Sequence, residues 1–214
     1  MGKPDLPGIT KLDSLHRSYL KRKREIRRRL REFRNVKPEM YFYELVYCIL
    51  TPQSSASNAF RVTEELQMKN FQNVDFNPEP ILGQRECYIR FHRTKAKHLL
   101  KVRQQYPAIE KMLLGSISAY ELRQWLVKNV MGMGWKEASH FLRNIGHRDL
   151  AILDRHILKH LQLFGLIQTF PKTLTLKKYL QIEKKFRNFS NMCGISMDEL
   201  DLLFWSLGTG KILK

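Results

Sequence analysis

The stretch Leu126–Gly146, LVKNVMGMGWKEASHFLRNIG, joins two helical patterns through a very short turn that contains Gly132 and Gly134. The two glycines allow positive φ angles and a close approach of the backbone to another molecule. The pattern therefore predicts a helix–hairpin–helix motif. Backbone N–H groups at such a turn, followed by the positive end of the helix that begins near Trp135, suit a phosphate oxygen of DNA. A tight turn with a glycine helix cap is the alternative interpretation.

Lys136 follows the second glycine by two residues and lies in the first turn of the next predicted helix. The positive end of a helix disfavours an ammonium group, so a lysine is an unusual choice for stability at this position. A neutral amine is the form that attacks a sugar C1′ atom and forms a Schiff base. Lys136 is therefore a candidate nucleophile.

Asp154, in the segment 151–161 (AILDRHILKHL), begins another helical pattern eighteen residues after Lys136. This separation is long enough for a helix of about ten residues and a return loop, so the two helix N-termini can lie side by side. An aspartate before an apolar run is commonly a helix N-cap. A carboxylate beside the lysine could also stabilise a cation-like sugar and transfer protons.

The rest of the chain is helical in pattern, and no alternating strand is apparent. Apolar residues recur at helical spacing along 11–33, and Thr51 with Pro52 resembles an N-cap followed by a first helical position. Residues 71–82 carry two prolines and are predicted to be a surface connection. We expect an all-α protein of about nine or ten helices.

The chain has 214 residues, of which 43% are hydrophobic, and 38 Lys and Arg against 20 Asp and Glu. The excess positive charge would attract a polyanion such as nucleic acid or an anionic lipid surface. Much of it lies in residues 21–31, KRKREIRRRLR, on the polar face of the first helix. This face is either simply solvated or in contact with phosphates, and the sequence leaves both open.

Membrane insertion is not expected, because the longest apolar segment, 41–51 (YFYELVYCILT), is short and contains Glu44. The N-terminal residues MGKPDLPGITKLD lack the apolar core of a signal peptide. Cys48, Cys87 and Cys193 lie far apart without a CxxC pair, which favours a reducing compartment and no iron–sulfur cluster.

Taken together, the hairpin glycines Gly132 and Gly134, Lys136 and Asp154 resemble the helix–hairpin–helix DNA glycosylase superfamily residue by residue. The loop before the aspartate, HRDLAILD, departs from the superfamily's Gly/Pro-rich loop because it contains no proline. The branches with a four-cysteine cluster fit less well, since only Cys193 lies near the C-terminus. The short length, the segment KEASHFLRNIG and the terminal lysine look most like the compact 8-oxoguanine DNA glycosylase/AP lyases of archaea and thermophilic bacteria. This resemblance covers most of the chain after residue 39.

The resemblance implies two helical lobes, with the active site in the cleft between them. One lobe would be a central barrel of residues 53–144 that ends in the hairpin motif, and the other would combine 1–52 with 145–214. Because the target nucleotide must leave the duplex, the family picture also implies residues that fill the gap. Gln53 and Phe91 are the candidates for duplex insertion, with His92 as the alternative to Phe91.

The base-recognition residues that the resemblance implies are Trp205, which would stack on the extruded base, and the terminal Lys214. Core packing is the alternative for Trp205, because Leu200, Leu203 and Phe204 form an apolar stripe beside it. The α-carboxylate of Lys214 would offer two acceptor oxygens to the two N–H donors on the pairing edge of guanine.

No redox or metal cofactor is expected, although the family suggests a monovalent cation held by hairpin carbonyls around Val130 and Met133. His156 and His160 share a helical face but lack the glutamate of a HExxH zinc site. The expected partner is double-stranded DNA with an oxidised base. The expected state is a monomer in a prokaryotic cytoplasm, associated with the nucleoid.

The resulting hypothesis is a bifunctional enzyme that excises 8-oxoguanine through a Lys136 Schiff base, assisted by Asp154, and then cleaves the strand by β-elimination. Two alternatives stay open. One is a noncatalytic helix–hairpin–helix DNA-binding protein, for which Lys136 and Asp154 would be replaceable. The other is a glycosylase of the same superfamily that acts on a different base lesion.

Overall fold

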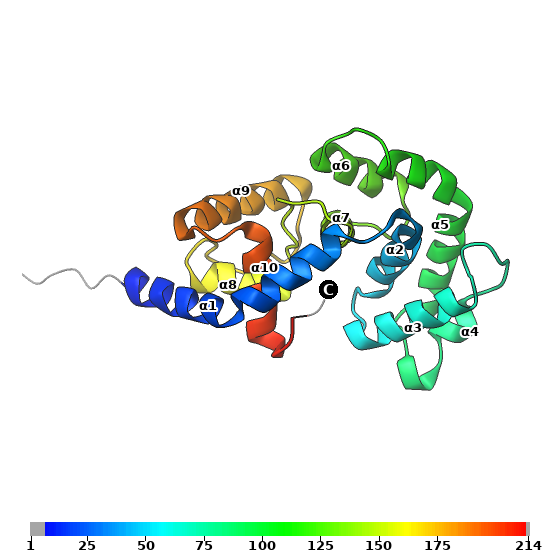
Figure 1. Ribbon diagram of the computed structural model, residues 1–214, viewed down its shortest axis with the longest axis horizontal. Coiled ribbons are helices and arrows are strands. Elements are labelled where there is room, and N and C mark those ends of the chain that lie inside the picture. Colours follow the sequence, from blue (N-terminus) through cyan, green and yellow to red (C-terminus); the bar gives the residue numbers. More distant parts are fainter. Residues whose placement is uncertain (1–6, 213–214) are drawn as a thin grey trace, which may run out of the picture. The chain divides into compact units, whose positions relative to one another are not determined.

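The structure is a computed structural model that describes residues 7–212, and in this range it contains helices, turns and loops but no strand (Figure 1). The predicted all-α class is therefore confirmed. The helices form two compact units. One contains residues 36–145, and the other contains the described residues up to 35 together with those from 146 onward.

The unit of residues 36–145 is built around a single buried helix, α2. Every residue from Phe42 to Leu50 in this helix is buried, as expected for a helix that is apolar on most of its surface. Helices α3, α5 and α7 pack against it. The elements of this unit are η1 (Pro38–Met40), α2 (Tyr41–Leu50), α3 (Ala56–Met68), α4 (Glu79–Leu82), η2 (Arg85–Cys87), α5 (His92–Leu113), α6 (Ala119–Asn129) and α7 (Trp135–Asn144).

The other unit is centred on α10, which packs against α1, α8 and α9 (Figure 1). Its helices are α1 (Pro7–Arg34), α8 (Arg155–Leu163), α9 (Leu176–Cys193) and α10 (Met197–Thr209). In α10, Leu200, Leu203 and Phe204 are completely buried. This unit therefore joins the first helix of the chain to the last three in one hydrophobic core.

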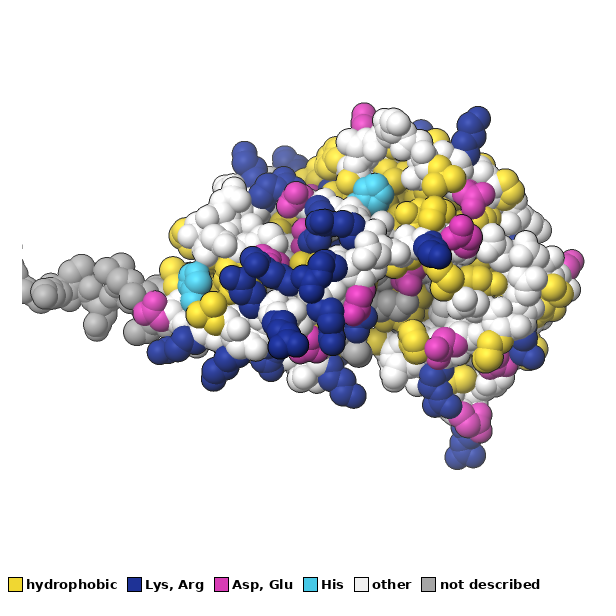
Figure 2. All heavy atoms as spheres, in the orientation of Figure 1, with side chains coloured by type: hydrophobic (Ala, Val, Ile, Leu, Met, Phe, Trp, Pro, Cys, Tyr) yellow, Lys and Arg dark blue, Asp and Glu magenta, His cyan; other side chains and the backbone are white. Residues whose placement is uncertain are grey.

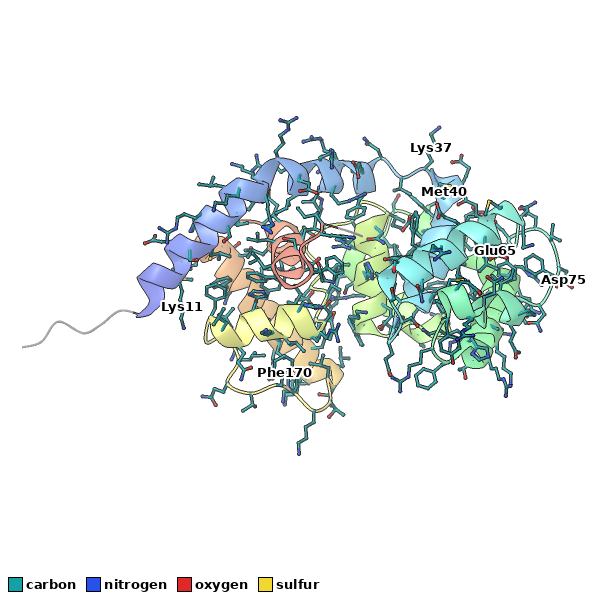
Figure 3. The ribbon with its side chains drawn as sticks, turned by 90° about the horizontal axis from the view of Figure 1, so that it is seen from below. Lys11, Lys37, Met40, Glu65, Asp75 and Phe170 are labelled. Atoms are coloured by element: carbon teal, nitrogen blue, oxygen red, sulfur yellow. The ribbon has the colours of Figure 1, made fainter. Side chains whose placement is uncertain are left out.

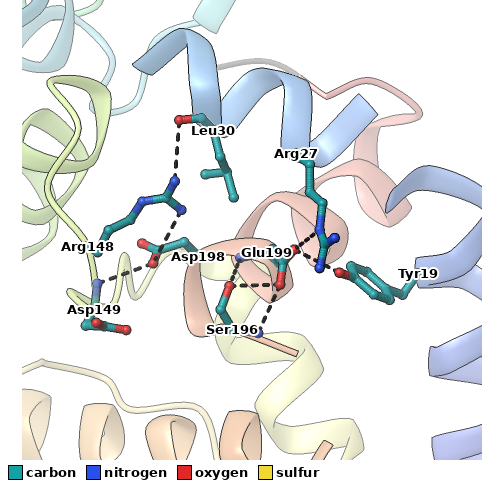
Figure 4. Close-up of polar contacts among 8 residues, drawn as sticks. All are labelled: Tyr19, Arg27, Leu30, Arg148, Asp149, Ser196, Asp198 and Glu199. Carbon is teal, nitrogen blue, oxygen red and sulfur yellow. Dashed lines mark hydrogen bonds and ion pairs between the residues drawn. The ribbon is translucent and has the colours of Figure 1, made fainter. Parts of the chain in front are cut away.

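Polar contacts also link α1 to α10 within this unit (Figure 4). The Tyr19 hydroxyl and the Arg27 Nε–H both donate to Glu199 Oε1, at 2.8 and 2.9 Å. Ser196 and Glu199 form a capping box at the start of α10. Burial raises the pKa of Glu199, but the hydrogen bonds from Arg27, Tyr19 and Ser196 outweigh it, and the net pKa is lowered.

Two local features, the start of α3 and the boundary between the two units, differ from the sequence-based expectations. Helix α3 begins at Ala56, and its N-cap is Ser55, whose side chain accepts from the Asn58 N–H, so the Thr51-Pro52 start was wrong. Helix α5 continues through Pro107, with Tyr106 and Ile109 buried on either side of it. The contacts of α2 place the change of unit near residue 36, whereas the sequence suggested residue 53.

Within residues 7–212, none of the helices combines the length and the apolar character that crossing a membrane requires.

Candidate active site

The hairpin between α6 and α7 has the geometry that the glycines predicted. Gly132 adopts a φ of +86°, and the Met133 N–H donates to the Val130 carbonyl at 3.2 Å. Gly134 is the N-cap residue of α7. A Cβ atom at Gly132 would lie 2.6 Å from Nδ1 of His98, closer than atoms can approach. The turn therefore requires a glycine for both its conformation and its space.

A buried arginine holds the two helices of the hairpin together. The Arg123 side chain is fully buried, and its guanidinium lies 4.8 Å from the ring centroid of Trp135 and 5.3 Å from that of Tyr120. Its Nη1 donates to the Ser139 hydroxyl at 3.1 Å. These contacts join α6 to the first turn of α7, so they fix the residue that precedes Lys136.

Lys136 is the second residue of α7, and its side chain is 26% exposed. Its Nζ lies 3.5 Å from Oε1 of Glu137, a neighbour that the sequence analysis did not single out. A Cβ atom on Gly134 would lie only 2.8 Å from Oε2 of Glu137, so this carboxylate also lies against the hairpin. An acidic residue in the first turn of a helix is common for stability alone, which explains why its sequence position carried no signal.

Lys95, on α5, is a second lysine that the sequence analysis missed. It is 6% exposed, and its Nζ donates to the carbonyls of Leu50 and Pro52, both at 2.7 Å, and to the Ser54 hydroxyl at 3.1 Å. The pKa of Lys95 is lowered to about 8, mainly because the side chain is buried. The charge of Lys136 contributes to this lowering, and Glu137 opposes it. Burial also lowers the pKa of His98, with Lys95 as the second cause.

Gln53 and Phe91 are both exposed, and both have left-handed backbone conformations, with φ angles of +55° and +60°. Gln53 lies in the turn between α2 and α3, and Phe91 is the N-cap residue of α5. Phe91 is 51% exposed, and the centroid of its ring lies 5.0 Å from the Arg90 guanidinium. His92, the alternative to Phe91, is partly buried and packs edge-on against the Tyr88 ring at 5.4 Å.

Asp154 is the N-cap residue of α8, in the other unit. Its Oδ1 accepts hydrogen bonds from the N–H groups of His156 and Ile157, at 2.8 and 2.9 Å. The N-cap interpretation is therefore confirmed as a structural role. This role occupies one carboxylate oxygen, and within residues 7–212 the Oδ2 atom makes no hydrogen bond.

Trp205 is partly exposed, unlike Leu203 and Phe204 beside it, so it is not a core residue of α10. Its ring packs edge-on against the ring of His156, with centroids 6.2 Å apart. A Cβ atom at Gly208 would lie 2.5 Å from Nδ1 of His156, so this glycine leaves room for the imidazole. His156 thus connects Trp205 to the Asp154 cap. Lys214 lies outside the described residues.

The structure therefore places Lys136, Gly132 and Gly134 together in the unit of residues 36–145, and Asp154 with Trp205 in the other unit. In the part of the chain that the structure describes, no three His, Cys, Asp or Glu side chains are grouped so as to hold a metal ion.

An all-α chain with a glycine hairpin, a lysine in the first turn after it and an aspartate N-cap eighteen residues later has the organisation of a helix–hairpin–helix DNA glycosylase. The family profile described as 8-oxoguanine DNA glycosylase matches residues 26–195. The chain belongs to this family.

Curated relatives are similar to this chain over nearly its whole length. The 8-oxoguanine DNA glycosylase/AP lyase of Korarchaeum cryptofilum is 40% identical over 190 residues, which are 88% of this chain and 90% of the relative. The enzyme of the same name from Methanocaldococcus jannaschii is 36% identical over 211 residues, or 96% and 99% of the two chains. The resemblance to the compact archaeal and thermophilic enzymes is confirmed.

Solved structures of 8-oxoguanine DNA glycosylases are also similar to this chain over nearly its whole length. The 8-oxoguanine glycosylase/lyase of Methanocaldococcus jannaschii in complex with a 15mer DNA containing 8-oxoguanine superposes with a TM-score of 0.86 at 34% identity, and covers 96% of this chain and 100% of that one. The 8-oxoguanine DNA glycosylase of Thermotoga maritima has a TM-score of 0.85 at 34% identity, with 96% and 99% coverage.

Proposed function

We propose that this protein excises 8-oxoguanine from duplex DNA and then cleaves the strand, as a bifunctional DNA glycosylase/AP lyase. The observation that carries the proposal is the position of Lys136, which is partly exposed in the first turn of α7 directly after the glycine hairpin. Membership of the 8-oxoguanine DNA glycosylase family supports the choice of lesion.

Lys136 is the proposed nucleophile. Its neutral amine attacks C1′ of the extruded nucleotide, a C1′–N bond forms, and the bond to the base breaks as the base takes up a proton. Opening of the sugar ring then gives a Schiff base. Removal of a proton from C2′ allows the 3′ phosphate to leave, which cleaves the strand by β-elimination. Glu137, whose Oε1 lies 3.5 Å from the Lys136 amine, is positioned to accept a proton from it.

Asp154 is the proposed electrostatic partner of this reaction. The N–H groups of His156 and Ile157 hold its side chain in place at the start of α8 through Oδ1. A carboxylate held in this way stabilises positive charge that develops on the sugar as the base departs. The hydrogen bonds to Oδ1 leave Oδ2 for this purpose.

The hairpin is the proposed site for a DNA phosphate, with Gly132 and Gly134 exposing backbone N–H groups at the start of α7. A monovalent cation is compatible with this turn, because carbonyl oxygens rather than carboxylates would be its ligands. The carbonyls of Val130 and Met133 are the candidates. The Val130 oxygen accepts one hydrogen bond, from the Met133 N–H, and retains a second lone pair.

Gln53 and Phe91 are the proposed insertion residues, since both are exposed at turns of the same unit. The exposure of Phe91 and the packing of His92 favour Phe91 as the aromatic wedge. Trp205 is the proposed stacking platform for the extruded base, because its ring is only partly covered. Lys214 remains a proposed base-recognition residue.

We further propose that α1 provides a second surface for DNA phosphates. Its buried face consists of Leu15, Tyr19, Ile26, Leu30 and Phe33. Directly opposite, at helical spacing, lie five exposed cations, here called the α1 basic stripe: Arg17, Lys21, Arg24, Arg28 and Arg31.

Figure 2 shows Lys and Arg side chains gathered over α1, and in Figure 3 many side chains of this helix point away from α10. The α1 basic stripe extends along the helix for about 21 Å at 1.5 Å per residue. A straight row of cations of this length matches the regular negative charge of a DNA duplex. We propose a monomer that acts on nucleoid DNA in a prokaryotic cytoplasm.

The experiment that tests the catalytic proposal is borohydride trapping on duplex DNA that contains 8-oxoguanine. Borohydride reduces a Schiff base to a stable amine, so the wild-type protein should become covalently attached to the DNA. The Lys136→Gln variant should give no adduct, whereas Lys128→Gln, which removes an exposed lysine from α6, should give as much adduct as the wild type.

A noncatalytic DNA-binding protein would bind the same duplex without forming an adduct, and this result would contradict the proposal. Trapping on duplexes with other oxidised or alkylated bases tests the remaining alternative, a glycosylase of the same superfamily that acts on a different lesion. More adduct on one of these duplexes than on 8-oxoguanine would reassign the lesion.

A further inference from the structure

Lys95 is a buried lysine whose hydrogen-bonding capacity is completely used. An ammonium group has three N–H donors, and Nζ of Lys95 has three acceptors within 3.1 Å: the carbonyls of Leu50 and Pro52 and the hydroxyl of Ser54. Burying a lysine is unfavourable unless its charge is compensated. The three acceptors provide this compensation, since Leu50 is also the last residue of α2, where the helix dipole favours a cation.

The acceptors of Lys95 surround Gln53, whose neighbours Pro52 and Ser54 both bind the ammonium. The left-handed conformation of Gln53, with a φ of +55°, is uncommon for a residue other than glycine. Such a conformation is strained and persists only where the surrounding structure determines it. Lys95 supplies that constraint, because a change in the Gln53 backbone would disturb the hydrogen bonds from the Lys95 ammonium to Pro52 and Ser54.

The same lysine is connected to the second left-handed residue, Phe91. The backbone N–H of Lys95 donates to the Phe91 carbonyl at 2.9 Å, and the Ser54 hydroxyl accepts the Arg90 N–H at 3.0 Å. Ser54 therefore joins the Lys95 ammonium to the residue before Phe91. One side chain links the turn of Gln53 to the turn of Phe91, although 38 positions separate these residues in the sequence.

We propose that Lys95 is a positioning residue for base extrusion, which holds the Gln53 and Phe91 turns in the conformations that enter the DNA duplex. This inference rests on the proposed function, in which Gln53 and Phe91 are the insertion residues. Extrusion of a base breaks its pairing and stacking in the duplex, and a pre-organised pair of turns avoids the additional cost of ordering them on the DNA.

Lys95 does not act as a second amine nucleophile in this scheme. A pKa lowered to about 8 gives the side chain a substantial neutral fraction near physiological pH. The side chain is only 6% exposed, however, and its three acceptors belong to the protein itself. Its amine would have to leave all three partners before it could reach a sugar.

The test is single-turnover excision by Lys95→Met at saturating enzyme, on a duplex with 8-oxoguanine opposite cytosine and 2-aminopurine next to the lesion. Methionine retains most of the apolar volume and removes all three donors. We expect excision about tenfold slower or more, because the strain of two left-handed residues is no longer compensated. We also expect a loss of the 2-aminopurine fluorescence rise that reports extrusion. The control Lys97→Met removes an exposed lysine of the same helix and should match the wild type.

A second substrate separates positioning from general damage to the protein. When 8-oxoguanine lies opposite an abasic site, no base pair has to be opened, so the defect of Lys95→Met should largely disappear. Ser54→Ala removes the link to Arg90 without affecting a charge, and should give a smaller defect with the same rescue. Ser54→Ala also provides the test if Lys95→Met fails to fold.

Combining the variants decides whether Lys95 acts through the two turns. If it does, Lys95→Met should add little to the defect of the double variant Gln53→Ala/Phe91→Ala. Three results would overturn the inference while borohydride trapping by the wild type still succeeded. The defects of Lys95→Met and the double variant could be fully additive, the defect of Lys95→Met could persist opposite the abasic site, or Lys95→Met could extrude the base as well as the wild type does. Failure of the proposed function is distinguishable, because the wild type itself would then give no trapped adduct.

Discussion

The hydroxyl of Tyr19 on α1 donates a 2.8 Å hydrogen bond to Oε1 of Glu199 on α10, across 180 positions of the sequence. Burial, followed by the hydrogen bond to Glu199, raises the pKa of Tyr19 to about 12, so the hydroxyl remains a donor at physiological pH. Arg27 donates to the same carboxylate oxygen at 2.9 Å (Figure 4). The first helix of the chain is therefore tied to the last by one ionised glutamate.

Glu199→Gln should destabilise the protein at neutral pH and less so in acid. The folded-state pKa of Glu199 is lowered, so its contribution is present above the unfolded value of about 4.5 and is lost as the pH falls through the folded value. We expect a loss of about 1.5–3 kcal/mol at pH 7, the range for hydrogen bonds to a charged group. Urea unfolding at pH 7 and pH 3 measures it, with Glu25→Gln on the exposed side of α1 as the control. An equal loss of stability at both pH values would show that the ionised Glu199 carboxylate is not the source of this stabilisation.

Asp154→Asn should remove catalysis while retaining the helix cap. The asparagine oxygen can still accept the N–H groups of His156 and Ile157, but the negative charge is gone. We expect a loss of excision of at least about a hundredfold with a nearly unchanged melting temperature. Asp154→Ala should lose the activity and also about 1 kcal/mol of stability. Full activity in Asp154→Asn would reduce this residue to a structural cap.

Gly132→Ala should disturb the hairpin. The φ of +86° is unfavourable for alanine, and the added Cβ would lie 2.6 Å from Nδ1 of His98. We expect a cost of about 1–3 kcal/mol in stability and weaker DNA binding. Fluorescence anisotropy with a short duplex measures the binding. Gly115→Ala, at a loop glycine without a positive φ, is the matched control, and an identical response of the two variants would argue against a phosphate site at the hairpin.

The α1 basic stripe should determine part of the salt dependence of DNA binding. Replacing Arg17, Lys21, Arg24 and Arg31 by glutamine should reduce the slope of log K against log salt by about 0.9 for each phosphate that the protein no longer neutralises. The rate of excision at saturating enzyme should not change. The control replaces the exposed lysines Lys172, Lys177, Lys178 and Lys184, which removes the same total charge. Equal slopes for the two variants would show that net charge matters and the stripe does not.

Lys95 should give the protein a stability that rises with pH. Burial lowers its pKa in the folded state from 10.5 to about 8, so between these values the unfolded chain binds a proton that the folded protein has lost. Unfolding therefore becomes less favourable as the pH increases from about 8 to 10. The difference in unfolding free energy between the wild type and Lys95→Met isolates this effect from the titrating tyrosines. It should grow by as much as about 3 kcal/mol over that range, and a constant difference would contradict it.

The local patterns of the sequence were sufficient for the fold class, the hairpin and the two candidate catalytic residues. Helix periodicity, the glycines at 132 and 134 and an N-cap aspartate depend on interactions between residues a few positions apart, so a single chain displays them directly. Family membership followed from the spacing of Lys136 and Asp154 behind that hairpin.

What only the tertiary structure decided depends on contacts between distant residues. The Lys95 ammonium binds the carbonyl of Leu50 at the end of α2, 45 positions earlier, and the residues on either side of the left-handed Gln53. The partial exposure of Trp205 between the buried Phe204 and Ser206, and the packing of its ring against His156, likewise depend on tertiary contacts. A sequence pattern does not reveal such contacts, because it records the order of side chains and not which of them meet after folding.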